Sequence, residues 1–373
     1  MRKIIRNIFI ASLLLSFVAC AVKVENSTNE SNIRYLEKWI KNNYPNATQS
    51  ELGTYILDET PSTIVDAAQV EVDGWAILDY TSRNLEGIVQ NTTLTEVAEK
   101  YLPIKSRKNF YYPQIFIVNT GSITAGLQDV LLGMKVGESK TVLIPSWLMS
   151  YKQYKTKEEY QNEKTEYSNT IYELKLIGFY KNIDERDSTL MIDYISKFKS
   201  DYVFASEYEM NITDTVETGF FYYPLEKGEQ DPEEESPEEG ENPEEGEDGE
   251  VDEIDTSINI NYIGTFLTYN SKKELITKTF DTNIETVAKD FGLYNSSTTY
   301  KQKKITWGED FNETKMDDNK VIPGFSKTLW QLKQNGDKRA IGIFWSKLGY
   351  GLTGVTDAIP AYAPLIFEIE IAE

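Results

Sequence analysis

The chain carries the same short pattern twice, about 200 residues apart along its 373 residues. Residues 126–137 read GLQDVLLGMKVG, and residues 324–336 read GFSKTLWQLKQNG with one residue added before the last glycine. Each stretch predicts a short helix that begins at one glycine and ends near a second glycine, with apolar residues along one face. A repeat at a fixed offset constrains the whole fold, because both copies must form the same unit.

Strand-like runs accompany each predicted helix. Residues 139–144 and 338–344 follow the two helices, and residues 170–177 and 365–371 end the two units. In the last run, Leu365, Phe367, Ile369 and Ile371 share one face, while Ile366, Glu368 and Glu370 share the other. We therefore expect an α+β fold in each unit, with an antiparallel sheet around one short helix.

An amphipathic helix is predicted to lead into each unit, at residues 35–44 and 192–202. We place the first unit at residues 33–181 and the second at 182–373, with the boundary near 182–188.

Most of the net charge of −22 lies in one acidic stretch, residues 226–255. Its Glu, Pro and Gly cannot bury enough apolar surface to fold, so we expect a disordered insertion within the second unit. The acidic balance argues against nucleic acid as a partner. Calcium is a weak alternative for residues 231–255, because no fixed ligand spacing is present.

The N-terminus predicts a secretion signal over residues 1–19. Arg2, Lys3 and Arg6 precede an apolar run, and residues 17–20 read FVAC, a sequence that resembles a bacterial lipobox. Lipidation of Cys20 would anchor the chain to a membrane of the bacterial envelope, on the periplasmic or surface face of the outer membrane. A plain signal peptide is the alternative. Residues 20–32 are predicted to form a polar tether.

Histidine is absent and Cys20 is the only cysteine. Catalysis by Ser/His/Asp or Cys/His groups and histidine zinc sites are therefore excluded. Disulfide frameworks and CxxC redox pairs are excluded as well.

Six motifs of the second unit occur in the order found in FKBP-type peptidyl-prolyl isomerases, which this unit resembles. They are residues 260–264 (INYIG), 279–282 (TFDT), 321–325 (VIPGF), 348–351 (LGYG), 358–360 (AIP) and 365–368 (LIFE). The family fold is a twisted antiparallel sheet around a short helix, in agreement with the pattern above.

The resemblance implies a proline-binding pocket lined by Tyr262, Phe280, Asp281, Val321, Ile322, Phe325, Tyr350, Ile359 and Phe367. It implies proline-containing polypeptides as substrates. Rotation about an X-Pro bond makes and breaks no covalent bond, so no cofactor is expected. Asp281 would orient a neighbouring phenol or stabilise the twisted carbonyl carbon. A structural Asp in a turn is its alternative.

Two departures from the family pattern stand out. Phe325 occupies the position where the family usually has Trp, which leaves a smaller apolar floor. The segment 283–320 is long, and Trp307 and Phe311 are the candidates for the aromatic residue that the family places there.

The first unit keeps the fold pattern and loses most of the site. Residues 79–81 (DYT) match the first motif, but 89–90 (VQ), 123–127 (ITAGL) and 148–150 (LMS) replace the others, and Tyr172 replaces the last Phe. We expect a scaffold or binding role there, with weak isomerase activity as the alternative. Residues 151–160 and 162–169 would form the loop over the eroded pocket. For the whole chain, a non-catalytic chaperone or protein-binding lipoprotein is the alternative to an isomerase.

Overall fold

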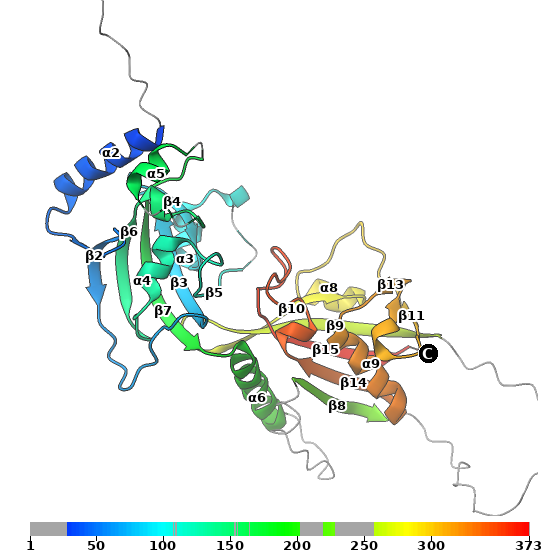
Figure 1. Ribbon diagram of the computed structural model, residues 1–373. Coiled ribbons are helices and arrows are strands. Elements are labelled where there is room, and N and C mark those ends of the chain that lie inside the picture. Colours follow the sequence, from blue (N-terminus) through cyan, green and yellow to red (C-terminus); the bar gives the residue numbers. More distant parts are fainter. Residues whose placement is uncertain are drawn as a thin grey trace, which may run out of the picture.

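The computed structural model describes residues 28–106, 108, 110–152, 154, 156–163, 165–201, 219–227 and 257–372. The chain forms two units, each an antiparallel sheet with a short helix against it (Figure 1). The α+β fold class predicted for both halves is confirmed. Glu226 and Lys227, the predicted start of the disordered insertion, belong to the strand Phe220–Lys227, so the insertion was placed two residues too early. Cys20 and residues 228–256 lie outside the described residues, so the lipid anchor and the rest of the disordered insertion stay predictions.

The first sheet has the order β1-β2-β6-β7-β3-β4, and β5 also pairs with β3. Its strands are β1 (Thr48–Gln49), β2 (Tyr55–Thr60), β3 (Trp75–Arg83), β4 (Val89–Thr92), β5 (Gln114–Ile117), β6 (Ser139–Ile144) and β7 (Thr170–Tyr180). The helices of this unit are α2 (Thr28–Asn43), α3 (Thr95–Tyr101), α4 (Ala125–Leu131) and α5 (Lys157–Gln161), with 3-10 turns at Ile104–Ser106 and Ser146–Leu148.

The second sheet has the order β13-β12-β11-β9-β15-β14-β8, and β10 also pairs with β9. Its strands are β8 (Phe220–Lys227), β9 (Ser257–Tyr269), β10 (Leu275–Thr282), β11 (Lys303–Thr306), β12 (Lys315–Met316), β13 (Asn319–Lys320), β14 (Asp337–Phe344) and β15 (Leu365–Ile371). Its helices are α6 (Ile183–Asp201), α8 (Glu285–Asp290) and α9 (Pro323–Asn335), with 3-10 turns at Phe311–Glu313 and Ser346–Leu348.

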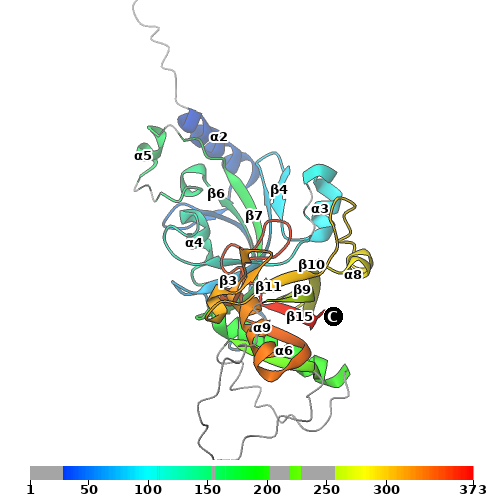
Figure 2. The same cartoon turned by 90° about the vertical axis from the view of Figure 1, so that its right-hand side faces the viewer.

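The two sheets share one topology over their central strands. The run β2-β6-β7-β3-β4 of the first unit corresponds to β8-β14-β15-β9-β10 of the second. In each unit a short helix follows the third of these strands in chain order, and Figure 2 shows these two helices, α3 and α8, on the same side of the molecule. Both halves therefore build one architecture, as the repeat in the sequence requires.

The repeated helix differs in length between the units. In α9, Pro323 stands in the first turn and Gly336 ends the helix in the left-handed conformation (φ 66°), as the sequence predicts. Its buried face contains Phe325, Thr328, Leu329 and Leu332. The first copy, α4, already ends at Leu131, so the prediction of a helix that continues to the closing glycine was wrong there.

The lead-in helix of the second unit covers the outer face of its sheet. Met191 and Ile195 of α6 pack with Leu267, Ile341 and Ile366. Ile366, which strand alternation placed on the polar face, is therefore buried at 4% exposure. The helix begins at Ile183 and not at residue 192 as predicted, so the predicted boundary at 182–188 falls at its start.

The lead-in helix of the first unit packs differently. Ile33 and Leu36 of α2 enter the main core of that unit. The predicted tether 20–32 is too long, because α2 begins at Thr28 and the buried Asn29 donates hydrogen bonds to the carbonyl oxygens of Tyr160 and Glu163. Tyr160 is fully buried, so the segment 151–169 is tied to α2 in this region. Within the described part of the chain, no helix is long and apolar enough to span a bilayer.

Candidate functional site

An aromatic cluster centred on Phe367 lies on the face of the second sheet that packs against α9. The centroid of the Phe367 ring lies 4.9 Å from that of Phe325, 5.8 Å from that of Phe280 and 6.2 Å from that of Tyr262. These residues come from β15, α9, β10 and β9. Phe344 of β14 stacks on Phe367 at 6.0 Å. The enclosure is apolar and built from rigid elements, which suits the binding of a small hydrophobic ring.

Gly264 lets two of these rings approach the sheet. It pairs with Phe367 in the β9–β15 ladder, and a Cβ atom on Gly264 would lie 2.9 Å from both the Phe280 and the Phe367 ring. We expect Gly264→Ala to displace the rings and to lower the free energy of unfolding by about 1–3 kcal/mol, the usual cost of overpacking. Thermal or denaturant unfolding of the variant measures this, and an unchanged stability would contradict it.

A β-bulge turns Phe280 and Asp281 toward the same site. Consecutive strand residues normally point to opposite faces, but the ladder between β9 and β10 shifts register between Thr279 and Asp281. The Phe280 ring thus meets Phe367, while the Asp281 carboxylate accepts a hydrogen bond of 2.7 Å from the Tyr262 hydroxyl. Burial, and then Asp281, raise the pKa of Tyr262, so this hydroxyl stays protonated and donates.

The remaining predicted site residues surround this cluster. Ile359 is buried at 4% exposure, and the half-buried Val321 and Ile322 pack against the same core beside the start of α9. Tyr350 is 37% exposed, and burial and then the charge of Asp281 raise the pKa of its hydroxyl. The structure therefore brings the nine predicted residues together at one site, with Asp281 and Tyr350 at its rim.

The two aromatic candidates in 283–320 differ in their surroundings. The Trp307 ring packs against the core but meets Trp330 on α9 at 6.1 Å. Phe311 has Lys327 over its ring. Neither ring contacts those of Tyr262 or Phe367 among the contacts of the described residues. Sequence reasoning missed Ile305 and Met316 of this segment: Ile305 is fully buried in the same core, and Met316 packs half-buried against it.

A buried ion pair holds the loop that carries Tyr350 and Ile359. Asp187 of α6 accepts hydrogen bonds from the Ser346 backbone N–H (2.9 Å) and hydroxyl (2.6 Å) at the start of this loop. Arg186 donates to the Tyr362 carbonyl oxygen (2.8 Å) at its end and pairs with Asp187 at 3.1 Å. Adjacent acidic and basic residues in a helix give no sequence signal of such a role. We call residues 346–362 the site loop.

The first unit retains part of the polar arrangement. Tyr80 there matches Tyr262, because Thr92 and Thr93 bond to its backbone as Thr282 and Asn283 do to that of Tyr262. This register places Gln90 and Asn91 at the positions of Phe280 and Asp281, so the sequence-based match to 89–90 was one residue off. Asn91 donates a 2.9 Å hydrogen bond to the Tyr80 hydroxyl. A neutral amide has thus replaced the carboxylate.

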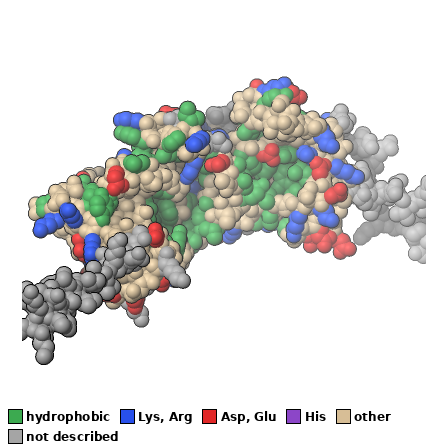
Figure 3. Space-filling view, turned by 90° about the horizontal axis from the view of Figure 1, so that it is seen from above, with side chains coloured by type: hydrophobic (Ala, Val, Ile, Leu, Met, Phe, Trp, Pro, Cys, Tyr) green, Lys and Arg blue, Asp and Glu red, His purple; other side chains and the backbone are tan. Residues whose placement is uncertain are grey.

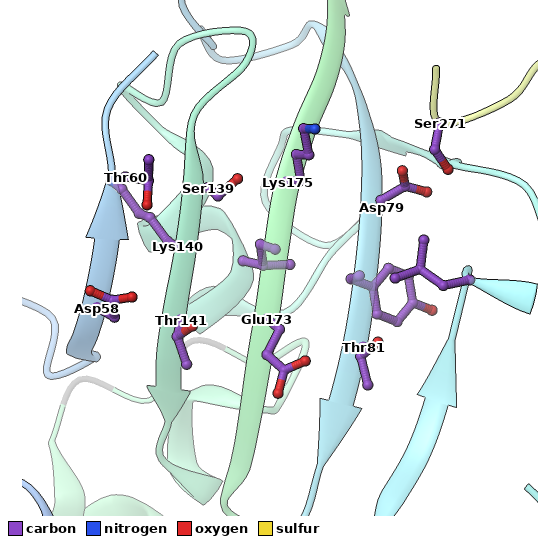
Figure 4. Close-up of a pocket in the computed structure, with 13 residues that line it drawn as sticks. Asp58, Thr60, Asp79, Thr81, Ser139, Lys140, Thr141, Glu173, Lys175 and Ser271 are labelled. Carbon is purple, nitrogen blue, oxygen red and sulfur yellow. The ribbon is translucent and has the colours of Figure 1, made fainter. Parts of the chain in front are cut away.

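A groove of about 350 Å³ crosses the outer face of the first sheet. Figure 4 shows Glu173 and Lys175 projecting into it from β7, beside Asp79 of β3, with Ser271 approaching from the second unit. Burial raises the pKa of Asp79, and Thr93 donates to it at 3.1 Å. In the part of the chain with described coordinates, no group of three or more carboxylate or thiol ligands could hold a metal ion. Residues 231–255, the predicted calcium alternative, lie outside that part.

Residues 293–372 match the model of the FKBP-type peptidyl-prolyl cis-trans isomerase family. A curated relative, the short-type peptidyl-prolyl cis-trans isomerase of Methanocaldococcus jannaschii, is 39% identical over 64 residues. That stretch covers 16% of this chain and 38% of the relative, so the chain spans less than half of the relative's length. Tyr262, Phe280 and Asp281 precede the matched family segment.

Solved structures of similar proteins were also found. FkpA from Escherichia coli aligns over 48% of this chain and 70% of its own, with 13% identity and a TM-score of 0.29. A peptidyl-prolyl cis-trans isomerase from Pseudomonas syringae pv. tomato covers 41% of this chain and 96% of its own, with 15% identity and a TM-score of 0.28. The three FKBP domains of wheat FKBP73 cover 87% and 98%, with 12% identity and a TM-score of 0.23.

Proposed function

Because the C-terminal unit belongs to the FKBP-type peptidyl-prolyl isomerase family, we propose that it catalyses cis-trans isomerisation of X-Pro bonds in the pocket around Phe367. The observation that carries this proposal is the enclosure of aromatic rings with Asp281 and Tyr350 at its rim. Substrates are proline-containing polypeptides.

The pocket supports isomerisation through its apolar environment. Amide resonance creates a barrier of about 18–20 kcal/mol, and transfer of the amide from water to an apolar site weakens that resonance. Phe280, Phe325 and Phe367 hold the pyrrolidine ring, and the Ile322 N–H and the Tyr350 hydroxyl fix substrate carbonyl oxygens. The hydrogen bond from Tyr262 supports the role of Asp281 as the group that orients this phenol.

The Asp281→Asn variant tests the site. Asparagine gives the Tyr262 hydroxyl a neutral acceptor in place of a charged one. Hydrogen bonds to charged groups are worth about 1.5–3 kcal/mol against about 0.5–1.5 kcal/mol for neutral ones, so we expect kcat/KM on a proline tetrapeptide to fall roughly tenfold. A protease-coupled assay measures it. Asp290→Asn, the same change at an exposed position that ends α8, serves as the control. Equal rates for the wild type and Asp281→Asn would exclude this assignment.

We further propose that the protein acts at the bacterial envelope on secreted or envelope proteins, anchored through a lipid on Cys20. The charged N-terminus, the apolar run and the FVAC sequence support this location. In cells, Cys20→Ala should move the protein from the membrane to the soluble fraction and abolish labelling by a fatty-acid analogue. Continued labelling of the variant would contradict lipidation at this residue.

The alternative function, a non-catalytic chaperone or protein-binding role, is based on the first unit. There Gln90 and Asn91 replace the aromatic and acidic residues of the site. A chaperone role predicts that the Asp281→Asn variant still prevents aggregation of an unfolded client at the wild-type level. Loss of this protection together with isomerase activity would assign both effects to the second pocket.

A further inference from the structure

A second cavity, of about 320 Å³, lies between the two units. One wall is the aromatic segment 110–112 that precedes β5, with Gln114 of β5 beside it. Thr353, Pro360 and Ala361 of the site loop line the other. We call this cavity the interdomain cleft. Its volume is in the range of small-ligand sites.

The aromatic wall is packed onto the second unit. The Phe110 and Tyr112 rings stack at 5.5 Å from each other, and they lie 5.7 Å and 6.0 Å from the fully buried Phe266 of β9. The Lys278 ammonium lies 5.3 Å from the Phe110 ring centroid. Tyr112 packs against the same core cluster that contains Phe367. The first unit thus contributes side chains at the edge of the second unit's site.

The opposite wall is continuous with the proposed pocket. Pro360 of the cleft directly follows Ile359 of the pocket in the site loop, and Thr353 donates to the carbonyl oxygen of Tyr350 at 3.3 Å. Arg186 and Asp187 hold both ends of this loop. In the view from above, hydrophobic side chains form a band across the middle of the molecule, hollowed near its centre (Figure 3). Cleft and pocket therefore share one fixed loop.

We propose that the interdomain cleft binds the apolar residues that flank the proline in an extended polypeptide substrate. This inference rests on the proposed isomerase function. Phe110, Tyr111 and Pro360 offer apolar contact to substrate side chains. Gln114, whose Oε1 accepts a 2.9 Å hydrogen bond from the Tyr80 hydroxyl, offers its amide nitrogen to the substrate backbone. A strand-like segment advances about 3.3 Å per residue, so two or three residues beyond the proline reach across such a cavity. The occupant is unfolded polypeptide, and the first unit acts as a specificity element.

The test compares a short and a long substrate. We expect Phe110→Ala combined with Tyr111→Ala to lower kcat/KM for a proline-limited refolding protein relative to that for a proline tetrapeptide, by about five- to tenfold. Thr353→Trp, which fills the cleft from the exposed side of the site loop, should change this ratio in the same direction. Tyr101→Ala, at a 50% exposed aromatic residue of the first unit, is the matched control.

The outcomes separate the two proposals. A wild-type protein without tetrapeptide activity would overturn the isomerase function itself. An active wild type whose cleft variants keep the ratio unchanged, or lose both activities in equal proportion, would overturn the cleft alone. A lower ratio in both cleft variants and an unchanged ratio in Tyr101→Ala would support it.

Discussion

Replacement of Arg186 by methionine is expected to lower the free energy of unfolding of the second unit by about 3–5 kcal/mol, because it leaves Asp187 buried without its partner. The exposed fractions of the Arg186 and Asp187 side chains are 4% and 0%. The variant also loses the hydrogen bond to the Tyr362 carbonyl oxygen. Denaturant unfolding measures the effect.

Arg339→Met provides the control, since the Arg339–Glu368 pair is 42% and 27% exposed. An exposed pair contributes about 0–1 kcal/mol, so this variant should change stability little. Equal effects of Arg186→Met and Arg339→Met would contradict the importance of the buried pair. The double variant Arg186→Met/Asp187→Leu should recover part of the loss, because no unpaired charge then remains.

The same pair makes stability depend on pH. Burial raises the pKa of Asp187 to about 6, although Arg186 and Ser346 favour the ionised form. The folded state therefore binds this proton more tightly than the unfolded chain, whose carboxyl has the ordinary value of 3.8. The stability contributed by this site is present below pH 3.8 and is lost as the pH rises through about 6. In Asp187→Asn this part of the pH dependence should disappear, as unfolding curves between pH 4 and pH 7 would show.

Phe367→Leu should lower isomerase kcat/KM by about tenfold or more while the fold is retained. An aliphatic side chain of similar volume in a core costs about 1.5 kcal/mol or less, so the protein stays folded. The ring contacts with Tyr262, Phe280 and Phe325 are lost, however, and the proline loses an aromatic wall. The tetrapeptide assay measures activity, and circular dichroism checks the fold.

Tyr172→Leu makes the corresponding change in the first unit, where Tyr172 lies 5.8 Å from Tyr80. Because Tyr172 belongs to the first unit and not to the second pocket, the change should leave tetrapeptide turnover within about twofold of the wild type. A factor of two corresponds to well under 1 kcal/mol. A large loss in Tyr172→Leu, or full activity in Phe367→Leu, would show that catalysis does not depend on the second pocket alone.

The sequence predicted those strands and helices that depend mainly on the pattern of their own residues. Residues 139–144 and 365–371 are strands at the predicted bounds, and both runs are rich in the β-branched residues that favour strands. The order of the six motifs also predicted that residues far apart in the sequence, such as Tyr262 and Phe367, lie at one site.

Features that depend on tertiary contacts could not be predicted. The match of Asn91 to Asp281 depends on the hydrogen bonds of Thr92 and Thr93 to the backbone of Tyr80. The burial of Ile366 depends on α6, which covers a face that strand alternation assigns to solvent. Arg186 and Asp187 are charged residues in a helix, and only the fold shows that they contact the site loop 176 and 159 residues later along the chain.

The position of α6 has a practical consequence for truncation of the chain. A fragment cut at the apparent boundary after Ser188 would keep the sheet and the aromatic residues of the second unit. It would nevertheless lack Arg186 and Asp187, and both ends of the site loop would lose their hydrogen bonds to the helix. A minimal catalytic fragment should therefore begin before Ile183, even though the segment matched by the family starts at residue 293.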